Sequence, residues 1–123
     1  MVLIGDAAGW NDPIIGQGLS ISLRDARLVS EVIGGDDWSP LAFEPYVGER
    51  SERMRRLRII AALMTELRCT FTPEGARRRK HWAERCAVDP SLLAHVVAYL
   101  RGPETVPAEA FEPANIRRIL SES

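Results

Sequence analysis

The fold is decided by the amino-terminal stretch Met1-Val-Leu-Ile-Gly-Asp-Ala-Ala-Gly-Trp-Asn-Asp-Pro-Ile-Ile-Gly-Gln-Gly-Leu-Ser20 and the residues that follow it to Ile33. Its apolar run Val2-Leu3-Ile4 is short and continuous, which is typical of a strand buried on both faces of a parallel sheet. A turn at Gly5-Asp6 and a loop rich in glycine and proline come next. The segment is therefore predicted to form a strand, a loop and then a helix that ends at Gly34-Gly35.

The helix predicted before Gly34 has one apolar face. The residues at helical spacing on that face are Leu19, Leu23, Ala26, Leu28, Val29 and Ile33. The charged residues, which fall mostly on the opposite side, are Arg24, Asp25, Arg27 and Glu31. We therefore expect the apolar set to be buried and the charged set to face solvent.

The remainder of the chain carries helical signals only. A long helix is predicted over residues 41–69, with an arginine-rich first half, and Thr72-Pro73-Glu74 is a good start for the next helix. Asp89-Pro90 repeats that signal, and a last short helix is predicted over residues 112–120. The expected fold is mainly α, with one orphan amino-terminal β-strand followed by about four to five helices.

Composition is that of a globular protein: 123 residues, 46% of them hydrophobic and 27% charged. No apolar run approaches the ~18 residues that a membrane span requires, and no secretory leader pattern is present, so we expect a cytoplasmic chain without a membrane partner. Because no secretory leader is present, Cys69 and Cys86 are expected to be reduced, structural thiols. No metal-ligand spacing surrounds them, so no metal site is expected. The basic block of residues 77–80 could indicate nucleic-acid binding, but a solvated or domain-facing helix surface is the favoured interpretation.

Two features of the first stretch could bind a ligand. Asp6 follows the predicted strand, so its carboxylate could accept a hydrogen bond from a ribose hydroxyl, although an aspartate in a turn is the simpler interpretation. Gly16-Gln17-Gly18 opens the predicted helix, where unpaired backbone N–H groups and the positive end of the helix dipole can meet an anion or a polarised carbonyl. Each signal is weak when taken alone.

Taken together, these features resemble a known motif. Gly5-Asp6-Ala7-Ala8, Pro13, Gly16-Gln17-Gly18 and Asp25-Ala26 have the spacing of the second FAD-binding motif of FAD-dependent monooxygenases of the aromatic-hydroxylase type, within the FAD/NAD(P)-binding oxidoreductases. Tyr46 and Arg50 resemble the Tyr-x-x-x-Arg that opens the next long helix of that family. Gly9 and Ser20 depart from the histidine and asparagine that are common there.

The resemblance implies a cofactor and its contacts. FAD would be the cofactor, NAD(P)H the reductant and a small molecule the substrate of the complete enzyme. Asp6 would hold the ribitol or ribose part of FAD. The other implied cofactor contacts, mostly through backbone atoms, are Gly5, Pro13, Gly16, Gln17, Gly18, Leu19 and Ser20. The resemblance assigns no catalytic residue and no substrate.

One part of that family's site is missing from this sequence. No Gly-x-Gly-x-x-Gly, the motif that seats the cofactor pyrophosphate, occurs in the chain. We therefore expect the carboxyl-terminal part of an α/β FAD-binding fold, with the second FAD motif in residues 1–35 and a helical region in residues 36–123. Such an incomplete domain should bind FAD weakly or not at all alone and should pair with the missing amino-terminal part or with itself. The alternative is a helical protein-interaction module without flavin chemistry, so the sequence leaves open whether the chain belongs to an active enzyme.

Overall fold

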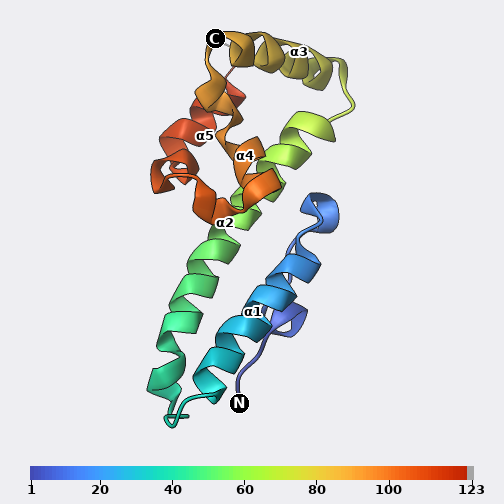
Figure 1. Cartoon of the computed structure of the whole chain (residues 1–123). Coiled ribbons are helices and arrows are strands. Elements are labelled where there is room, and N and C mark those ends of the chain that lie inside the picture. The colour runs from blue at the N-terminus through green and yellow to red at the C-terminus, as the bar shows by residue number, and fades with distance from the viewer. Residues whose placement is uncertain (122–123) are drawn as a thin grey trace. The chain divides into compact units, whose positions relative to one another are not determined.

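The computed structural model describes residues 1–121, and these form a mainly helical protein (Figure 1). The α-helices are α1 (Gly18–Ile33), α2 (Glu44–Arg68), α3 (Pro73–Val88), α4 (Ala94–Arg101) and α5 (Pro113–Leu120). Short 3₁₀ turns connect them. The chain divides into two compact units, one of residues Met1–Arg55 and one from Arg56 onward, and each is described by itself. The mainly α prediction is confirmed, whereas the predicted boundary at residue 35 stays a prediction.

The predicted orphan strand is wrong. Residues 2–4 are not hydrogen-bonded to any strand, and residues 1–121 contain no β-strand at all. Ile4 has extended backbone angles (φ −133°, ψ 163°), but it precedes the 3₁₀ turn Gly5–Ala8 (η1). A strand requires a ladder of hydrogen bonds with a neighbour, and an apolar run cannot supply that neighbour by itself. The segment is extended backbone whose Leu3 carbonyl accepts a hydrogen bond from a side chain, the Tyr46 hydroxyl (2.7 Å).

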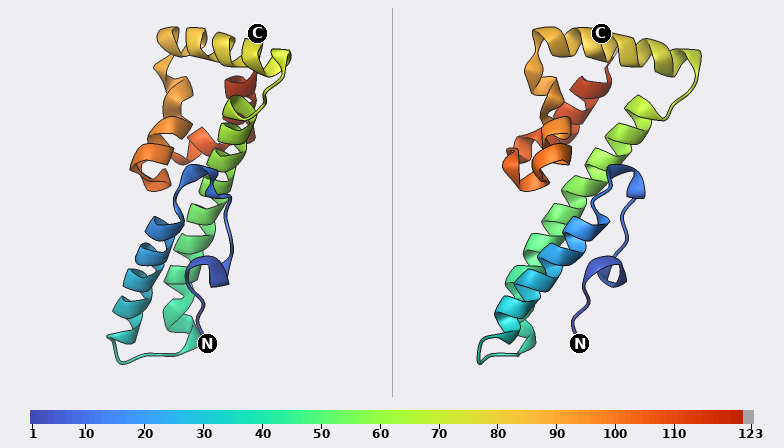
Figure 2. Two further views of the ribbon diagram at one scale, coloured as in Figure 1. Left: turned by 90° about the vertical axis from the view of Figure 1, so that its right-hand side faces the viewer. Right: turned by 45° about the vertical axis from the view of Figure 1, so that its right-hand side comes forward.

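The first unit is built from η1, two further 3₁₀ turns at Pro13–Ile15 (η2) and Pro40–Phe43 (η3), α1 and the beginning of α2. α1 and the first turns of α2 lie side by side and run in opposite directions (Figure 2). η2 begins where the Asp12 carboxylate accepts a hydrogen bond from the Ile14 backbone N–H (2.9 Å), and Gly16 follows in the left-handed region (φ +60°). These turns lead the chain from η1 into the start of α1.

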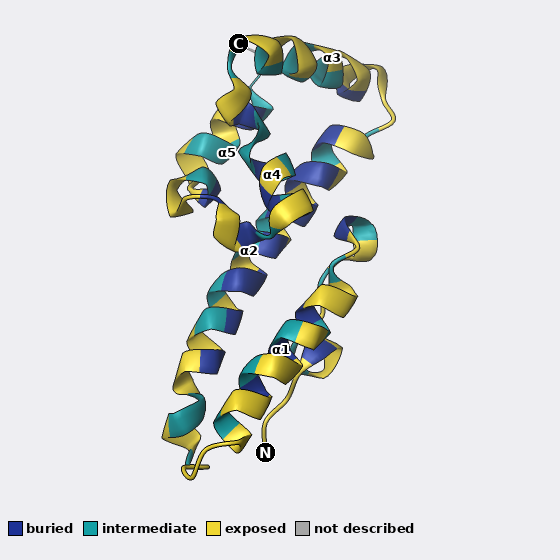
Figure 3. Ribbon diagram, viewed as in Figure 1, coloured by how far each residue is buried: buried dark blue, intermediate teal, exposed yellow. Residues whose placement is uncertain are grey.

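The buried face of α1 differs from the predicted one. Ile21, Asp25 and Val29 are its buried residues, spaced four apart along one face (Figure 3). Leu19 and Leu23, which were expected in the core, are 72% and 62% exposed. Of the predicted apolar set, Val29 alone is buried. Apolar spacing therefore placed the centre of the buried face wrongly, because it treated Asp25 as a surface residue.

The second unit contains a hydrophobic cluster formed by three of its helices and the 3₁₀ turn Pro90–Leu93. Its fully buried members are Leu63, Leu67, Leu92 and Ile119, with Trp82 and Cys86 packed against them. Near the start of this unit the Arg56 guanidinium donates to the carbonyl oxygens of Pro103 (3.1 Å) and Val106 (3.2 Å). It also lies 5.0 Å from the centre of the Phe111 ring, a cation–π arrangement.

Local start signals in this unit are confirmed. α3 begins where the Thr72 hydroxyl accepts a hydrogen bond from the Gly75 backbone N–H (3.1 Å). The turn at Asp89-Pro90 becomes a 3₁₀ turn, Pro90–Leu93 (η4), that leads directly into α4.

Cys69 and Cys86 are free thiols. None of the helices in residues 1–121 combines the length and apolarity that a membrane crossing requires.

Candidate functional site

The centre of the first unit is the carboxylate of Asp25, which is fully buried on α1. One of its oxygens, Oδ2, accepts hydrogen bonds from the Gly5 backbone N–H (2.9 Å) and from Arg50 Nε (2.8 Å). The other oxygen, Oδ1, accepts from an Arg53 guanidinium nitrogen at 2.7 Å. A buried carboxylate is tolerated where such charged donors replace the water that it has lost.

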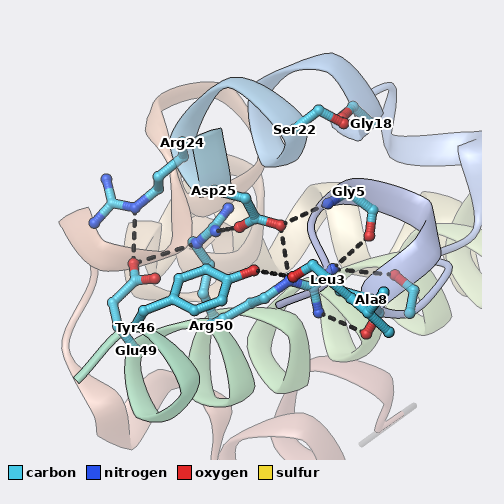
Figure 4. Close-up of polar contacts among 12 residues, drawn as sticks. Leu3, Gly5, Ala8, Gly18, Ser22, Arg24, Asp25, Tyr46, Glu49 and Arg50 are labelled. Atoms are coloured by element: carbon cyan, nitrogen blue, oxygen red, sulfur yellow. Dashed lines mark hydrogen bonds and ion pairs between the residues drawn. The ribbon is translucent and has the colours of Figure 1, made fainter. Parts of the chain in front are cut away.

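Arg50 connects Asp25 to the loop that begins at Gly5. Besides its bond to Asp25, its guanidinium donates to the carbonyl oxygens of Gly5 (2.7 Å), Ala8 (3.1 Å) and Gly9 (3.4 Å). Figure 4 shows Arg50 reaching from α2 between Asp25 and this loop. We call Asp25, Arg50 and the η1 loop of residues 5–9 the clamp.

Tyr46 and Glu49 extend the network along α2. Burial and the negative charge of Asp25 raise the pKa of the Tyr46 hydroxyl, which keeps it a donor to the Leu3 carbonyl. The Glu49 carboxylate lies 2.7 Å from Arg24 Nε and 3.3 Å from Arg53 Nε. Glu49 thereby joins α1 to α2 at the more exposed side of the same cluster (Figure 4).

Gly5 is required where it stands, for two reasons. Its φ of +55° lies in the left-handed region, which costs any other L-residue about 1–2 kcal/mol. A Cβ at this position would also lie 2.8 Å from the Ser22 hydroxyl on α1, so η1 approaches the helix closely. The Ser22 hydroxyl in turn donates to the Gly18 carbonyl (3.0 Å). η1 therefore lies against the first turns of α1.

The structure places the predicted cofactor contacts around this start of α1. Asp6 lies in η1 with an exposed side chain, next to the buried Gly5. The residues Pro13, Gly16, Gln17, Gly18, Leu19 and Ser20 follow one another from η2 into the first turn of α1. Of these, Gln17 is half-buried and the other five are exposed. Their assignment as flavin contacts stays a prediction.

Asp25, Arg50 and Arg53 are the site residues whose role sequence reasoning missed. Asp25 was expected on the solvent face of its helix, and the arginines were expected to decorate the surface of theirs, yet Arg50 and Arg53 are only 8% and 7% exposed. The available signal was the resemblance itself, which included Asp25 and Arg50 without giving them a contact. The bonds that Asp25 accepts come from residues 20, 25 and 28 positions away in sequence, so local periodicity could not pair them.

An apolar pocket of about 740 Å³ adjoins the clamp, which contributes Ala8 and Arg50 to its lining. Its polar lining groups include Arg50 and Tyr46, whose donors are already bonded to the clamp and to Leu3. The remaining lining is mostly aliphatic and aromatic. The lining residues are Met1, Val2, Leu3, Ala8, Ile33, Trp38, Pro40, Phe43, Tyr46, Val47, Arg50 and Ser51.

The start of α1 and the described acidic, histidine and cysteine side chains differ in what they offer a ligand. Across residues 1–121 no group of three or more histidine, cysteine, aspartate or glutamate side chains is placed to hold a metal ion. At the start of α1 no acidic residue occupies the first turn, which is the arrangement that leaves the positive end of the helix dipole uncompensated within the helix itself. A Cβ at Gly16 or Gly18 would meet no atom within 4 Å, so a ring could approach the backbone at these two glycines.

Comparison with known proteins gives one informative similarity. The chain is similar to 1H-pyrrole-2-carbonyl-(peptidyl-carrier protein) chlorinase of Pseudomonas fluorescens (strain Pf-5), with 43% identity over 51 residues. The match covers 38% of this chain and 11% of the chlorinase, so the chain spans only a small part of that relative. No protein-family model matches the chain, and no solved structure matches it either.

This similarity corrects the family resemblance drawn from the sequence. The motif of residues 5–26 was assigned to monooxygenases of the aromatic-hydroxylase type, but the relative found is a chlorinase. A short motif of glycines and two aspartates specifies the backbone of a loop and of a helix start, and enzymes with different reactions can share it. The assignment to aromatic hydroxylases was therefore wrong.

Proposed function

We propose that this chain is part of a flavoenzyme of the halogenase type and contributes the loop and helix start that face the flavin. The observation that carries the proposal is the 43% identity to the chlorinase over 51 residues. The order of glycines and Asp6 along residues 5–20 supports it, since this is the stretch for which the sequence predicts FAD contacts. The proposal also includes the fold: η1, α1 and α2 would complete an α/β FAD-binding domain whose remaining elements lie outside this sequence.

In the proposed site this chain binds and orients the cofactor. The backbone N–H groups at the start of α1 would face the most electron-rich edge of the flavin, and the helix dipole there would favour negative charge on it by about 0.3–1 kcal/mol. The carboxylate of Asp6 would accept hydrogen bonds from hydroxyls of the ribityl chain. FAD, once bound, would supply the redox chemistry, with NAD(P)H as the source of electrons. The pyrophosphate half of FAD would be held by residues outside this chain.

Binding of FMN to the chain tests the proposal, because FMN carries the flavin half of the cofactor alone. We expect weak, saturable changes in the ¹H–¹⁵N correlation spectrum, confined to the amides of Asp6 and of residues 16–20. AMP, which is the other half of FAD, should leave these amides unchanged. Spectra that resolve individual amides detect binding too weak for co-purification.

Two glycine variants separate flavin contact from effects on folding. Gly18 and Gly48 both lie in α-helices, and a Cβ at either one would meet no atom within 4 Å. Gly18→Ala should weaken the FMN response about tenfold, because the new methyl group occupies the approach to the backbone. Gly48→Ala should leave it unchanged. Absence of any FMN response at saturating ligand, or equal loss in both variants, would refute the proposed function.

A further inference from the structure

We propose that Asp25 and Arg50 are positioning residues that hold η1 at both ends and thereby set the affinity of this part of the chain for a flavin. The flavin half of this inference rests on the proposed function. The mechanical half, that the pair fixes the loop of residues 5–9, can be tested without any ligand. Neither residue needs to touch the cofactor.

The contacts of the pair cover both ends of one short turn. At the start of η1, the Gly5 N–H donates to Asp25 Oδ2 at 2.9 Å. At its end, the carbonyls of Ala8 and Gly9 accept from Arg50 at 3.1 and 3.4 Å. A 3₁₀ turn of four residues has few internal hydrogen bonds of its own. The ion pair therefore supplies the bonds that define the shape of the turn.

The loop has conformational freedom that the pair must restrict. Gly5 and Gly9 have φ values of +55° and +135°. Because glycine has no Cβ, each of them can also adopt many other backbone conformations. A loop that begins and ends in such glycines loses much backbone entropy when it is fixed. Because Asp6 lies between them, its carboxylate has a defined direction only while both ends of the loop are held.

Arginine is the side chain that suits this task. Its planar guanidinium presents donors in a rigid fork, so one group can bond Asp25 and several carbonyls together. Lysine keeps the charge but offers a single ammonium on a flexible stem. A buried ion pair contributes little net stability compared with apolar residues of the same volume, so its value here lies in fixing one arrangement.

Arg53 provides a matched control inside the same cluster. Like Arg50 it is nearly buried, lies on α2 and bonds to the Asp25 carboxylate, at 2.7 Å. Its other ion pair is with Glu49, and it donates no hydrogen bond to residues 5–9. The variants Arg50→Lys and Arg53→Lys therefore make the same chemical change at the same carboxylate, but only the first removes bonds to the loop.

Amide hydrogen exchange and FMN titration, both followed by NMR, test the inference. Arg50→Lys removes the guanidinium bonds to the carbonyls of Gly5, Ala8 and Gly9, which should let the loop open more often. We therefore expect the Gly5 and Gly9 amides, which donate to Asp25 and to the Asp6 carbonyl, to exchange about tenfold faster or more. We expect FMN to bind about tenfold more weakly to that variant. In Arg53→Lys both quantities should stay within about threefold of the wild type.

The outcomes are distinguishable from failure of the proposed function. If the wild type ignores FMN, the proposed function and the flavin half of the inference are wrong, and amide exchange alone decides the mechanical half. Equal changes in Arg50→Lys and Arg53→Lys would overturn both halves. If Arg50→Lys does not fold, Asp25→Asn replaces it in the titration. In that case, the wild-type exchange rates decide whether the pair fixes the loop of residues 5–9. If the Gly5 and Gly9 amides of the wild type exchange as fast as in an unstructured chain, the loop is not fixed and the inference is wrong.

Discussion

The second unit contains a buried histidine, His95, whose surroundings lower its pKa. His95 is 3% exposed, and its ring lies against Trp82 with 5.6 Å between the ring centres. Burial lowers the pKa of His95 to about 4, and the positive charge of Arg68 adds to that shift. An unfolded histidine has a pKa of about 6.5, so between about pH 6.5 and pH 4 the unfolded chain binds a proton that the folded chain rejects.

Stability should therefore fall as the pH is lowered through this range. We expect His95 to lower the free energy of unfolding by about 2 kcal/mol between pH 7 and pH 5, measured by urea denaturation at the two pH values. His95→Leu removes the proton-binding group while filling a similar volume, so the difference between the two pH values should shrink by that amount. A variant that keeps the wild-type pH dependence would contradict this assignment.

Asp25 shows why single residues of the site could not be assigned from the sequence. A charged residue in an amphipathic pattern is expected on the surface, and that expectation holds unless partners for the charge lie close in space. Here the partners are Gly5, Arg50 and Arg53, which are separated from Asp25 by 20, 25 and 28 residues. The resemblance located Asp25 and Arg50 as motif residues, but only the packing of α1 on α2 shows what they bind.

At the scale of secondary structure, the start of α3 depends on a cap that the sequence predicts. The Thr72 hydroxyl accepts a hydrogen bond from the Gly75 N–H at 3.1 Å. Thr72→Ala should lower the free energy of unfolding by about 1 kcal/mol, measured by urea denaturation, because the freed N–H loses its partner. Thr65→Ala, at an exposed site inside α2, is the control and should change stability by less than about 0.5 kcal/mol. Equal losses in both variants would mean that the cap contributes nothing.

Helix boundaries were predictable because their signals are local. Thr72-Pro73, Asp89-Pro90 and Gly34 act on the backbone within a few residues, and each lies at an observed boundary. The run of residues 2–4 was not predictable in the same way, since a strand exists only with a neighbour and residues 1–121 provide none. The buried face of α1 failed for a related reason: the neighbours of a helix select its buried face, and they are distant in sequence.

At the scale of the whole molecule, charge is distributed unevenly along the chain. Residues 49–85 carry eleven basic and five acidic side chains, whereas residues 1–48 carry two basic and seven acidic ones. Several of these basic side chains form ion pairs or hydrogen bonds within their own unit. Arg78 pairs with Glu66, Arg77 pairs with Glu74 at 3.0 Å, and the Arg79 guanidinium donates to the Thr70 carbonyl at 2.7 Å. The basic block on α3 is therefore largely compensated by its own surroundings.

This compensation predicts that the chain does not bind nucleic acid. A fluorescent DNA duplex should show no saturable anisotropy change at about 50 mM salt, where binding driven by phosphate contacts is strong. The double variant Glu66→Gln, Glu74→Gln removes the carboxylates that face Arg78 and Arg77 and raises the net charge of α3 and its partner segment by two. It should retain DNA detectably, with affinity that falls as salt is added, because the released guanidinium groups can then contact phosphates. Wild-type binding with the same salt dependence would show that the arginines prefer phosphate to their present partners and would refute the prediction.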